Sequence, residues 1–481
     1  MAISAMLRSL AQHPRTCDRL AFTGDDDLTF AQVQGQANTA QQLMRELGVK
    51  RGDVVGAVLY NESSMYAIML ACCMIGAAIL PLNPRLHPSE RNALLHRTKA
   101  RVCWASSQLP GPPQVQIVDT AQLLVPSREH PASDEGTTED LCWIAATGGT
   151  TGVPKLYAVT QGNLLDNLLI NTADWELDRH GVHVSAAPLA HGIGFCNALA
   201  QLLHGGTVHL DARLSADAAL AAMARYRACW TALVPTILFD LTSAAQQSLP
   251  CLELVVCAGS TLPAKVRRAV ADRFPRADIR EYYGSTEMGW VTSHNSEQWQ
   301  HAPGSVGLPT RGTELRILTE SGMVAAPGEI GVIHKRGRPY AVGRFEELEH
   351  HRIGWSDWVS SGDRGHIDDQ GRLHLAGRVD DLIIVGGLNV DPTEVIQVLV
   401  EHPDVSAVLI EGRPDERLGQ QLHAYVETSR TDEAMAAELV NFARGRMSTY
   451  KMPSSFEFRT QLPRTAAGKI SLAAIGQEGS R

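Results

Sequence analysis

The chain has 481 residues, too many for one ordinary domain, so the length predicts two or more. A content of 44% hydrophobic and 20% charged residues is typical of a soluble globular protein. The formal net charge of −9 argues against a nucleic-acid-binding protein, which normally carries a basic face, yet it leaves room for a local basic pocket that binds an anion.

Nine cysteines without a CxxC pair favour neither a disulfide framework nor a cysteine-rich zinc site, and they fit reduced thiols in a cytoplasmic protein. Residues 1–16 lack the apolar core of a signal peptide. Residues 65–82 carry no charge over the minimum length of a membrane span. We interpret this run instead as a buried helix and a short buried strand that Gly76 separates, and we expect no membrane span.

Short apolar strands alternate with helical stretches from about residue 28 to 274, which predicts an α/β domain with a largely parallel sheet. The predicted strands are residues 53–60, 100–106, 141–146, 183–189, 206–210, 230–235 and 252–259. Residues 328–337 and 371–378 indicate a more antiparallel region. After Val379 the pattern predicts a smaller α+β domain, with a helix over 392–405 and a strand over 406–412.

The segment "ATGGTTGVPK" (146–155) follows a predicted strand and is rich in glycine and threonine. Glycines let backbone amides converge on an oxyanion, and threonine hydroxyls add donors. The spacing fits neither GxxxxGK[ST] nor GxGxxG, which excludes a mononucleotide P-loop and a dinucleotide fingerprint. A tight turn between two strands is the structural alternative.

Four further segments carry groups suited to a nucleotide. "REYYGSTEMGW" (280–290) offers an aromatic ring, a hydroxyl and a carboxylate that can hold Mg²⁺. "SSGDRGHID" (360–368) offers an aspartate for ribose hydroxyls. "LAGRVDDLIIVGGLNVDPTEV" (375–395) offers an arginine for phosphate, and "LPRTAAGKIS" (462–471) places a lysine after a flexible glycine.

Together and in this order, the five segments resemble the motifs of the adenylate-forming superfamily, which comprises acyl-CoA synthetases, peptide-synthetase adenylation domains and luciferases. The chain is most similar in appearance to ligases for benzoate-type acids, and the resemblance covers about residues 20–475. It implies an adenylation core over residues 1–379, with parallel-rich sheets covered by helices and a β-rich subdomain, and a small mobile α+β lid domain over residues 380–481.

The resemblance also implies a role for each matched residue. Implied contacts to ATP or AMP are made by Thr147, Gly148, Gly149, Thr150, Thr151, Gly152, Lys155, Gly259, Ser260, Thr261, Glu281, Tyr282, Tyr283, Gly284, Ser285, Thr286, Asp363, Arg378 and Lys469. Implied catalytic residues are His191, Thr286, Glu287 and Lys469, with Glu287 as the Mg²⁺ ligand. The implied acyl pocket consists of His191, Ala258, Gly284 and Met288. Arg85, Gly386 and Gly387 are implied contacts of coenzyme A, and Asp380 is the implied hinge. Two positions depart from the phosphate-loop pattern, Gly148 for a serine and Leu156 for the last glycine.

The implied reaction uses ATP, Mg²⁺ and coenzyme A to convert a carboxylic acid to an acyl adenylate and then to a thioester. We expect an apolar, aromatic acid, with a medium-chain fatty acid as the alternative. An amino acid is disfavoured because "PLAHGIGF" (188–195) lacks the aspartate that would hold an ammonium group.

The acceptor stays open between coenzyme A and the phosphopantetheine arm of an acyl carrier protein. Arg85 favours coenzyme A, whereas Leu418, Met452 and Ser454 replace groups that would help to bind it. A non-catalytic nucleotide-binding relative is disfavoured because the matched catalytic positions are present. The sequence leaves the oligomeric state open.

Overall fold

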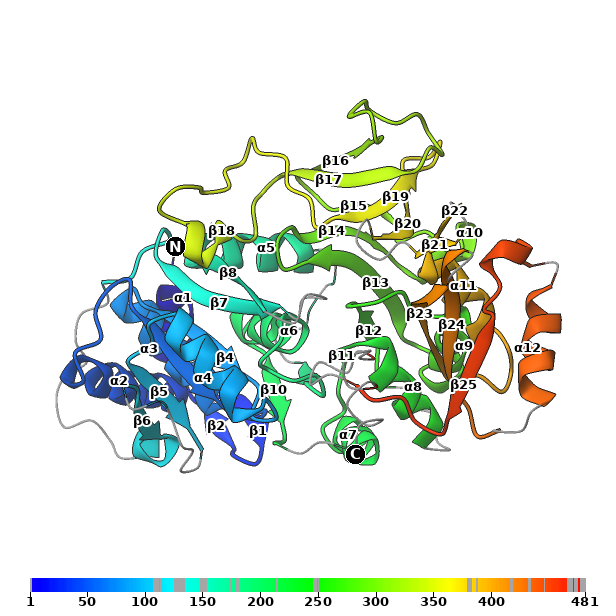
Figure 1. Ribbon diagram of the computed structural model, residues 1–481. Coiled ribbons are helices and arrows are strands. Elements are labelled where there is room, and N and C mark those ends of the chain that lie inside the picture. Colours follow the sequence, from blue (N-terminus) through cyan, green and yellow to red (C-terminus); the bar gives the residue numbers. More distant parts are fainter. Residues whose placement is uncertain are drawn as a thin grey trace.

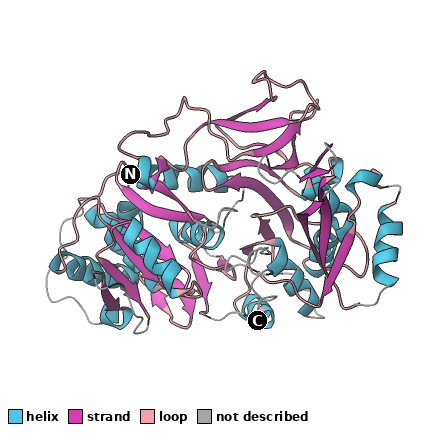
Figure 2. Ribbon diagram, viewed as in Figure 1, coloured by secondary structure: helices cyan, strands magenta, loops and turns pink. Residues whose placement is uncertain are grey.

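The computed structural model describes residues 2–106, 112, 114–124, 135–147, 154–173, 175, 177, 181–212, 215–244, 249, 251–378, 383–385, 388–415, 418–430, 434–444, 446–464, 470 and 475. Only the backbone is described for residues 171, 236, 244, 378, 384, 388, 389, 419 and 450. Two large sheets with helices between and around them form the main body, and a smaller sheet with its own helices lies at one side (Figures 1 and 2).

The larger of the two main sheets has nine strands in the order β15-β14-β13-β12-β11-β9-β10-β1-β2. Strands β1, β10, β9, β11, β12 and β13 pair in parallel, whereas β2, β14 and β15 pair antiparallel at the two edges. Their bounds are β1 Leu20–Gly24, β2 Leu28–Thr29, β9 Val182–Val184, β10 Thr207–Leu210, β11 Trp230–Leu233, β12 Leu254–Cys257, β13 Asp278–Ser285, β14 Gly289–His294 and β15 Leu308–Pro309.

The other main sheet has seven strands in the order β18-β8-β7-β4-β3-β5-β6. Its parallel strands are followed at one edge by the antiparallel pairs β7·β8 and β8·β18. The bounds are β3 Val54–Val58, β4 Ala78–Leu82, β5 Val102–Ala105, β6 Gln116–Asp119, β7 Leu141–Thr147, β8 Lys155–Thr160 and β18 Gly343–Arg344.

The predicted α/β architecture is confirmed by the helices that cover both sheets. These helices are α1 Ile3–Gln12, α2 Phe30–Glu46, α3 Ser64–Ile75, α4 Pro88–Arg97, α5 Gln161–Thr172, α6 Gly192–Leu203, α7 Ala216–Arg225, α8 Pro235–Ala244, α9 Ala264–Arg273 and α10 Ser296–His301, with the 3₁₀ turns η1 Thr120–Leu124 and η2 Phe345–Glu347. The largest core cluster joins α3 and α6 to strands of both sheets, so these two helices lie between the sheets.

The uncharged run over residues 65–82 divides as expected. Helix α3 is apolar on all sides, which is typical of a fully buried helix. It ends at Gly76, whose φ of 82° is readily adopted only by glycine, and the buried strand β4 follows. Among the described residues, no helix is both long and apolar enough to cross a membrane.

A four-stranded antiparallel sheet in the order β16-β17-β19-β20 forms the β-rich subdomain. Its strands are β16 Thr313–Leu318, β17 Gly331–Gly337, β19 Asp363–Ile367 and β20 Leu373–Arg378. The smaller C-terminal sheet contains β21 Ile383–Val385, β22 Leu388–Val390, β23 Ala407–Asp415, β24 Gly419–Glu427 and β25 Ser455–Arg459, with α11 Pro392–Val400, α12 Ala434–Ala443 and the 3₁₀ turn η4 Thr449–Lys451. Its core cluster is separate from those of the main sheets.

Several predicted elements were too long; the strands expected over 230–235 and 252–259, for example, span only Trp230–Leu233 and Leu254–Cys257. The strand expected over 183–189 stops at Val184, because Asn61 takes the carbonyls of Ser185 and Ala187 with its side-chain amide and Pro188 has no amide proton to donate. The helix expected over 392–405 stops at Val400, shortly before Pro403, which disfavours helical backbone in the residue before it.

Candidate active site

The predicted nucleotide residues after β12 lie at the carboxyl end of a parallel strand. Gly259, Ser260 and Thr261 are exposed there. Gly259 has a φ of 92°, and its left-handed backbone turns the chain outward at the strand end. In open parallel sheets, ligands bind outside the carboxyl ends of the strands, so the position of this segment fits its predicted role.

Tyr283 and Asp363 meet across two different sheets. The Tyr283 hydroxyl donates to Asp363 Oδ2 at 2.6 Å, and the Ser361 hydroxyl donates to the same oxygen at 2.6 Å. Asp363 also pairs with the backbone of Arg378 in the register of β19 and β20. The fold therefore brings together the predicted adenine-stacking ring, the predicted ribose carboxylate and the backbone of the predicted phosphate arginine.

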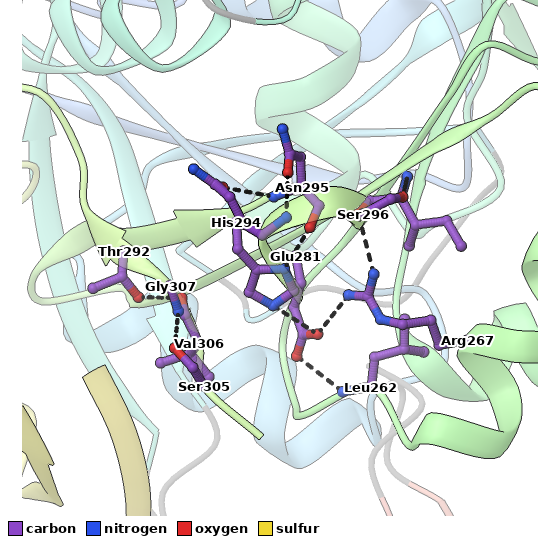
Figure 3. Close-up of polar contacts among 12 residues, drawn as sticks. Leu262, Arg267, Glu281, Thr292, His294, Asn295, Ser296, Ser305, Val306 and Gly307 are labelled. Carbon is purple, nitrogen blue, oxygen red and sulfur yellow. Dashed lines mark hydrogen bonds and ion pairs between the residues drawn. The ribbon is translucent and has the colours of Figure 1, made fainter. Parts of the chain in front are cut away.

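Glu281, two residues before Tyr283 on β13, is buried in an ion pair with Arg267 (Figure 3). Its carboxylate accepts from Arg267 Nη2 at 3.1 Å and from the Leu262 amide at 3.0 Å, and His294 Nε2 lies 3.4 Å away. Burial lowers the pKa of the Arg267 guanidinium, and the Glu281 charge opposes this effect. The Glu281 side chain thus holds the segment after β12 against β13, and its predicted contact with nucleotide would come from its backbone alone.

The predicted Thr286 and Glu287 lie on the turn between β13 and β14. A Cβ on Gly284 would lie 2.1 Å from the Gly289 carbonyl oxygen, so the close approach of the two strands requires glycine there. The Met288 amide donates to Ser285 Oγ at 3.2 Å, and Lys335 Nζ donates to the Met288 carbonyl at 2.6 Å. The turn that carries the predicted metal ligand is therefore fixed from both sides.

The base of the glycine-threonine segment is a closed antiparallel ladder. Thr147 at the end of β7 is the register partner of Lys155 at the start of β8, and the Thr147 hydroxyl donates to the Lys155 carbonyl at 3.3 Å. Arg97 Nη1 donates to the Pro154 carbonyl at 2.7 Å and pairs with Glu346 at 2.5 Å. Residues 148–153, which include the predicted Gly148, Gly149, Thr150, Thr151 and Gly152, lie outside the described residues.

Glu287 fits a metal ion that arrives with a nucleotide. Among the described residues, no three His, Cys, Asp or Glu side chains gather into a group that could hold a metal ion by themselves. Mg²⁺ is commonly bound by one or two carboxylates together with substrate phosphates, so the single Glu287 carboxylate is sufficient when a nucleotide supplies further ligands. The Glu287 carboxylate interacts with the Tyr157 hydroxyl, and burial together with the Glu287 charge raises the pKa of Tyr157 to about 12.

His191 occupies the N-cap position of α6, where its carbonyl accepts from the Phe195 amide. Asn61 fixes the segment before it, because Asn61 Oδ1 accepts from the Leu189 amide at 3.0 Å. This role of Asn61 was not predicted, since a lone asparagine far away in the sequence gives no signal.

Residues predicted for the acyl pocket come from different environments. Ala258 is buried at the end of β12, whereas Met288 is packed within the core cluster of the β-rich subdomain. Tyr282 alternates with Tyr283 along β13 and so faces the opposite side of the sheet. There its ring lies 4.5 Å from Trp290, which stacks at 5.0 Å on Trp175. The side chain of Tyr282 thus belongs to an aromatic cluster, away from the Tyr283 face.

The remaining predicted residues are not gathered at this site by the described structure. Arg85 is exposed in the connection between β4 and α4. Asp380, Gly386, Gly387 and Lys469 lie outside the described residues. Strands β21 and β22 pair antiparallel, with Val385 opposite Leu388.

The fold, together with the contact between Tyr283 and Asp363 beside the turn of Thr286 and Glu287, is the arrangement expected of an adenylate-forming enzyme. Residues 10–343 match the AMP-binding enzyme family, and residues 394–469 match the AMP-binding enzyme C-terminal domain. The chain belongs to the AMP-binding enzyme family, which confirms the predicted superfamily and the predicted class of acid–thiol ligases.

Individual relatives are similar over nearly the whole chain. The 2-succinylbenzoate–CoA ligase of Bacillus licheniformis is 29% identical over 466 residues, covering 95% of this chain and 96% of the relative. A feruloyl-CoA synthase of Amycolatopsis is 30% identical over 460 residues, covering 93% of each. The solved structure of O-succinylbenzoate coenzyme A synthetase from Bacillus subtilis in complex with ATP and magnesium ion is 26% identical, with a TM-score of 0.86 and coverage of 97% of this chain and 98% of that chain.

Proposed function

We propose that this protein is an ATP-dependent carboxylic acid–CoA ligase. It activates an apolar, aromatic acid as acyl-AMP with release of pyrophosphate, and it then transfers the acyl group to the thiol of coenzyme A. The observation that carries the proposal is the hydrogen bond between Tyr283 and Asp363 beside the turn of Thr286 and Glu287. A ring tied to a carboxylate suits an adenosine, and the adjoining turn offers a hydroxyl and a carboxylate where its phosphates would lie.

The chemistry explains why such a site needs donors and positive charge. A carboxylate is a poor acyl donor because its leaving group would be oxide, whereas AMP leaves readily. Attack of the carboxylate on the α-phosphorus joins two anions, so the step is accelerated by oriented donors and cations. In this chain the Thr286 hydroxyl, the amides around Thr147 and the ammonium of Lys469 are the proposed donors. Mg²⁺ held by Glu287 would neutralise phosphate charge when it is bound.

The proposed aromatic acid is supported by the side chains on the Tyr282 face of β13. Tyr282, Trp290 and Trp175 form a continuous set of ring contacts there, with Trp230 at 5.9 Å from Trp175. In the proposal this cluster forms one wall of the acyl pocket, and aromatic rings in a binding site favour a flat apolar substrate. The relatives named for succinylbenzoate and feruloyl groups agree with this choice, and a medium-chain fatty acid remains the alternative because apolar walls discriminate weakly.

The proposal is tested by pyrophosphate release from ATP and Mg²⁺ with a panel of acids, followed by thioester formation with coenzyme A. The panel pairs benzoate-type acids with medium-chain fatty acids. We expect release with at least one benzoate-type acid and a higher kcat/KM for it than for hexanoate or octanoate. Absence of release with every acid would refute the proposed activity, and preference for a fatty acid would refute only the aromatic substrate.

A carrier-protein acceptor is the second candidate, and the C-terminal domain contains an observation in its favour. Lys451 Nζ pairs with Glu394, so the charge that could meet a coenzyme A phosphate is already balanced. Leu418 packs against the core cluster of that domain. A phosphopantetheine arm on a protein lacks the adenosine phosphates and would not need these groups. Adenylate formed in advance and then offered coenzyme A or a set of holo carrier proteins separates the two acceptors by their rates of thioester formation.

The cytoplasm is the proposed compartment. All nine cysteines lie among the described residues, and none is disulfide-bonded, which agrees with a reducing environment. Fractionation of the producing cells, with the protein detected by immunoblot, tests this location.

A further inference from the structure

The sheet edge beside the glycine-threonine segment carries three polar side chains on one face. Tyr157 is the register partner of Arg344 on β18 and of Ala145 on β7, and directly opposed residues in a sheet point to the same side. Lys155 lies two residues before Tyr157 on β8, so it also points to that side. A row of Lys155, Tyr157 and Arg344 therefore runs from the end of the phosphate segment to the edge of the sheet.

This row leads to the predicted metal ligand. The Tyr157 hydroxyl interacts with both the Glu287 carboxylate and the Arg344 guanidinium. A phenol has one proton to donate and can accept another, so it donates to the carboxylate and accepts from the guanidinium.

Arg344 pairs weakly with Glu347, so its guanidinium can leave this carboxylate for a phosphate. Its Nη1 lies 3.2 Å from Glu347 Oε1, three residues further on, and the two side chains are 44% and 55% exposed. Exposed pairs of this kind are weak, whereas an arginine fork binds phosphate oxygens through two charge-assisted hydrogen bonds. The neighbouring Arg97 has two partners, because it binds both Glu346 and the Pro154 carbonyl.

We infer that Arg344 binds the β- and γ-phosphates of ATP, and the pyrophosphate formed from them, next to Glu287. Tyr157 is a positioning residue: its hydroxyl lies between the guanidinium and the carboxylate, so that Arg344 does not pair with Glu287 and occupy the carboxylate oxygens that would hold the metal ion. The inference rests on the proposed function, because it assigns a further binding residue to the same ATP site.

The test measures equilibrium binding of three ligands, MgATP, magnesium pyrophosphate and AMP, by calorimetry with the full chain. For Arg344→Ala we expect the dissociation constants of MgATP and pyrophosphate to rise by roughly 10- to 100-fold, the effect of one lost charge-assisted contact, while that of AMP changes less than about twofold. Arg344→Lys keeps the charge without the fork and should fall between Arg344→Ala and the wild type.

The matched control is Arg276→Ala, which removes another exposed arginine from an ion pair, with Glu253 at 3.4 Å. It should leave all three affinities unchanged. Tyr157→Phe should raise the Mg²⁺ concentration needed for half-maximal ATP–pyrophosphate exchange by a larger factor than it raises the dissociation constant of AMP. Loss of packing alone would not give this pattern.

Two results would overturn the inference: unchanged pyrophosphate affinity in Arg344→Ala, or equal weakening of AMP and ATP, which would point to general damage of the site. Failure of the proposed function looks different, because the wild-type protein itself would then show no acid-dependent exchange between ATP and pyrophosphate.

Discussion

Removal of Arg267 should strongly destabilise the adenylation core, because it leaves the Glu281 carboxylate buried without its cation. The two side chains are only 4% and 5% exposed and lie 3.1 Å apart. Breaking a buried pair by removing one partner costs about 3–5 kcal/mol. Arg267→Met keeps most of the aliphatic stem but removes the guanidinium from its place over the Trp299 ring, so the loss reports on the charge together with that contact.

The second half of this prediction concerns recovery of stability when the Glu281 charge is removed as well. Arg267→Met/Glu281→Gln removes the stranded charge and keeps an oxygen to accept from the Leu262 amide. We therefore expect the double variant to be more stable than Arg267→Met alone by about 1–3 kcal/mol, in the range of coupling energies between residues in contact. Arg276→Met is the control, since its exposed pair with Glu253 should contribute less than about 1 kcal/mol.

Urea unfolding followed by tryptophan fluorescence measures these differences, because Trp299 lies against the Arg267 guanidinium at 4.8 Å. The midpoints are compared between variants whose transitions have equal slopes. If Arg267→Met shifted the midpoint no more than Arg276→Met does, or if the effects of the two core substitutions simply added, the account of a buried and mutually dependent pair would be wrong.

Three further predictions concern single side chains. Asp363→Ala removes the acceptor of Tyr283 and should raise the dissociation constants of ATP and AMP alike by about tenfold or more, as measured by calorimetry, whereas an effect on ATP alone would contradict a ribose contact. Burial lowers the pKa of Lys335 to about 8, so the unfolded chain binds more protons than the native protein between pH 8 and 10.5. The stability of the native protein should therefore rise with pH in that window, by at most about 3 kcal/mol. The urea midpoint of Lys335→Met should lack this rise, and an identical rise in that variant would refute the assignment. Lys469→Ala should slow acid-dependent ATP–pyrophosphate exchange by about 100- to 1000-fold, and near-normal exchange would show that another cation serves the first step.

The parts of the fold that followed from the sequence are those fixed by local chemistry. The uncharged run over residues 65–82 divides at Gly76 because a left-handed residue was needed to end a buried helix. The strand predicted over 183–189 was too long because of a contact with a residue far away in the sequence. Nothing near residue 185 indicates that the Asn61 side chain would donate to the carbonyl of Ser185.

The same distinction holds for the site. Tyr283 and Asp363 were each predicted from a short motif, and the hydrogen bond between them agrees with a shared ligand. Glu281 was grouped with the nucleotide contacts because it precedes Tyr283, but its side-chain partner Arg267 belongs to the preceding helix α9 and no motif includes it. Arg344 was missed for a similar reason, because its significance depends on the register of β18 against β8.

The two-residue strand β18 also bears on how the chain is made. Strand β8 has β7 on one side, and on its other side its partner among the described residues is β18, from a much later part of the sequence. During synthesis, β18 cannot cover the outer edge of β8 until residues 343 and 344 have left the ribosome, whereas the other strands of this sheet are made earlier. An open strand edge readily pairs with another chain. Until β18 is made, this edge is therefore a place where the nascent chain can pair with another chain, and one short strand covers it.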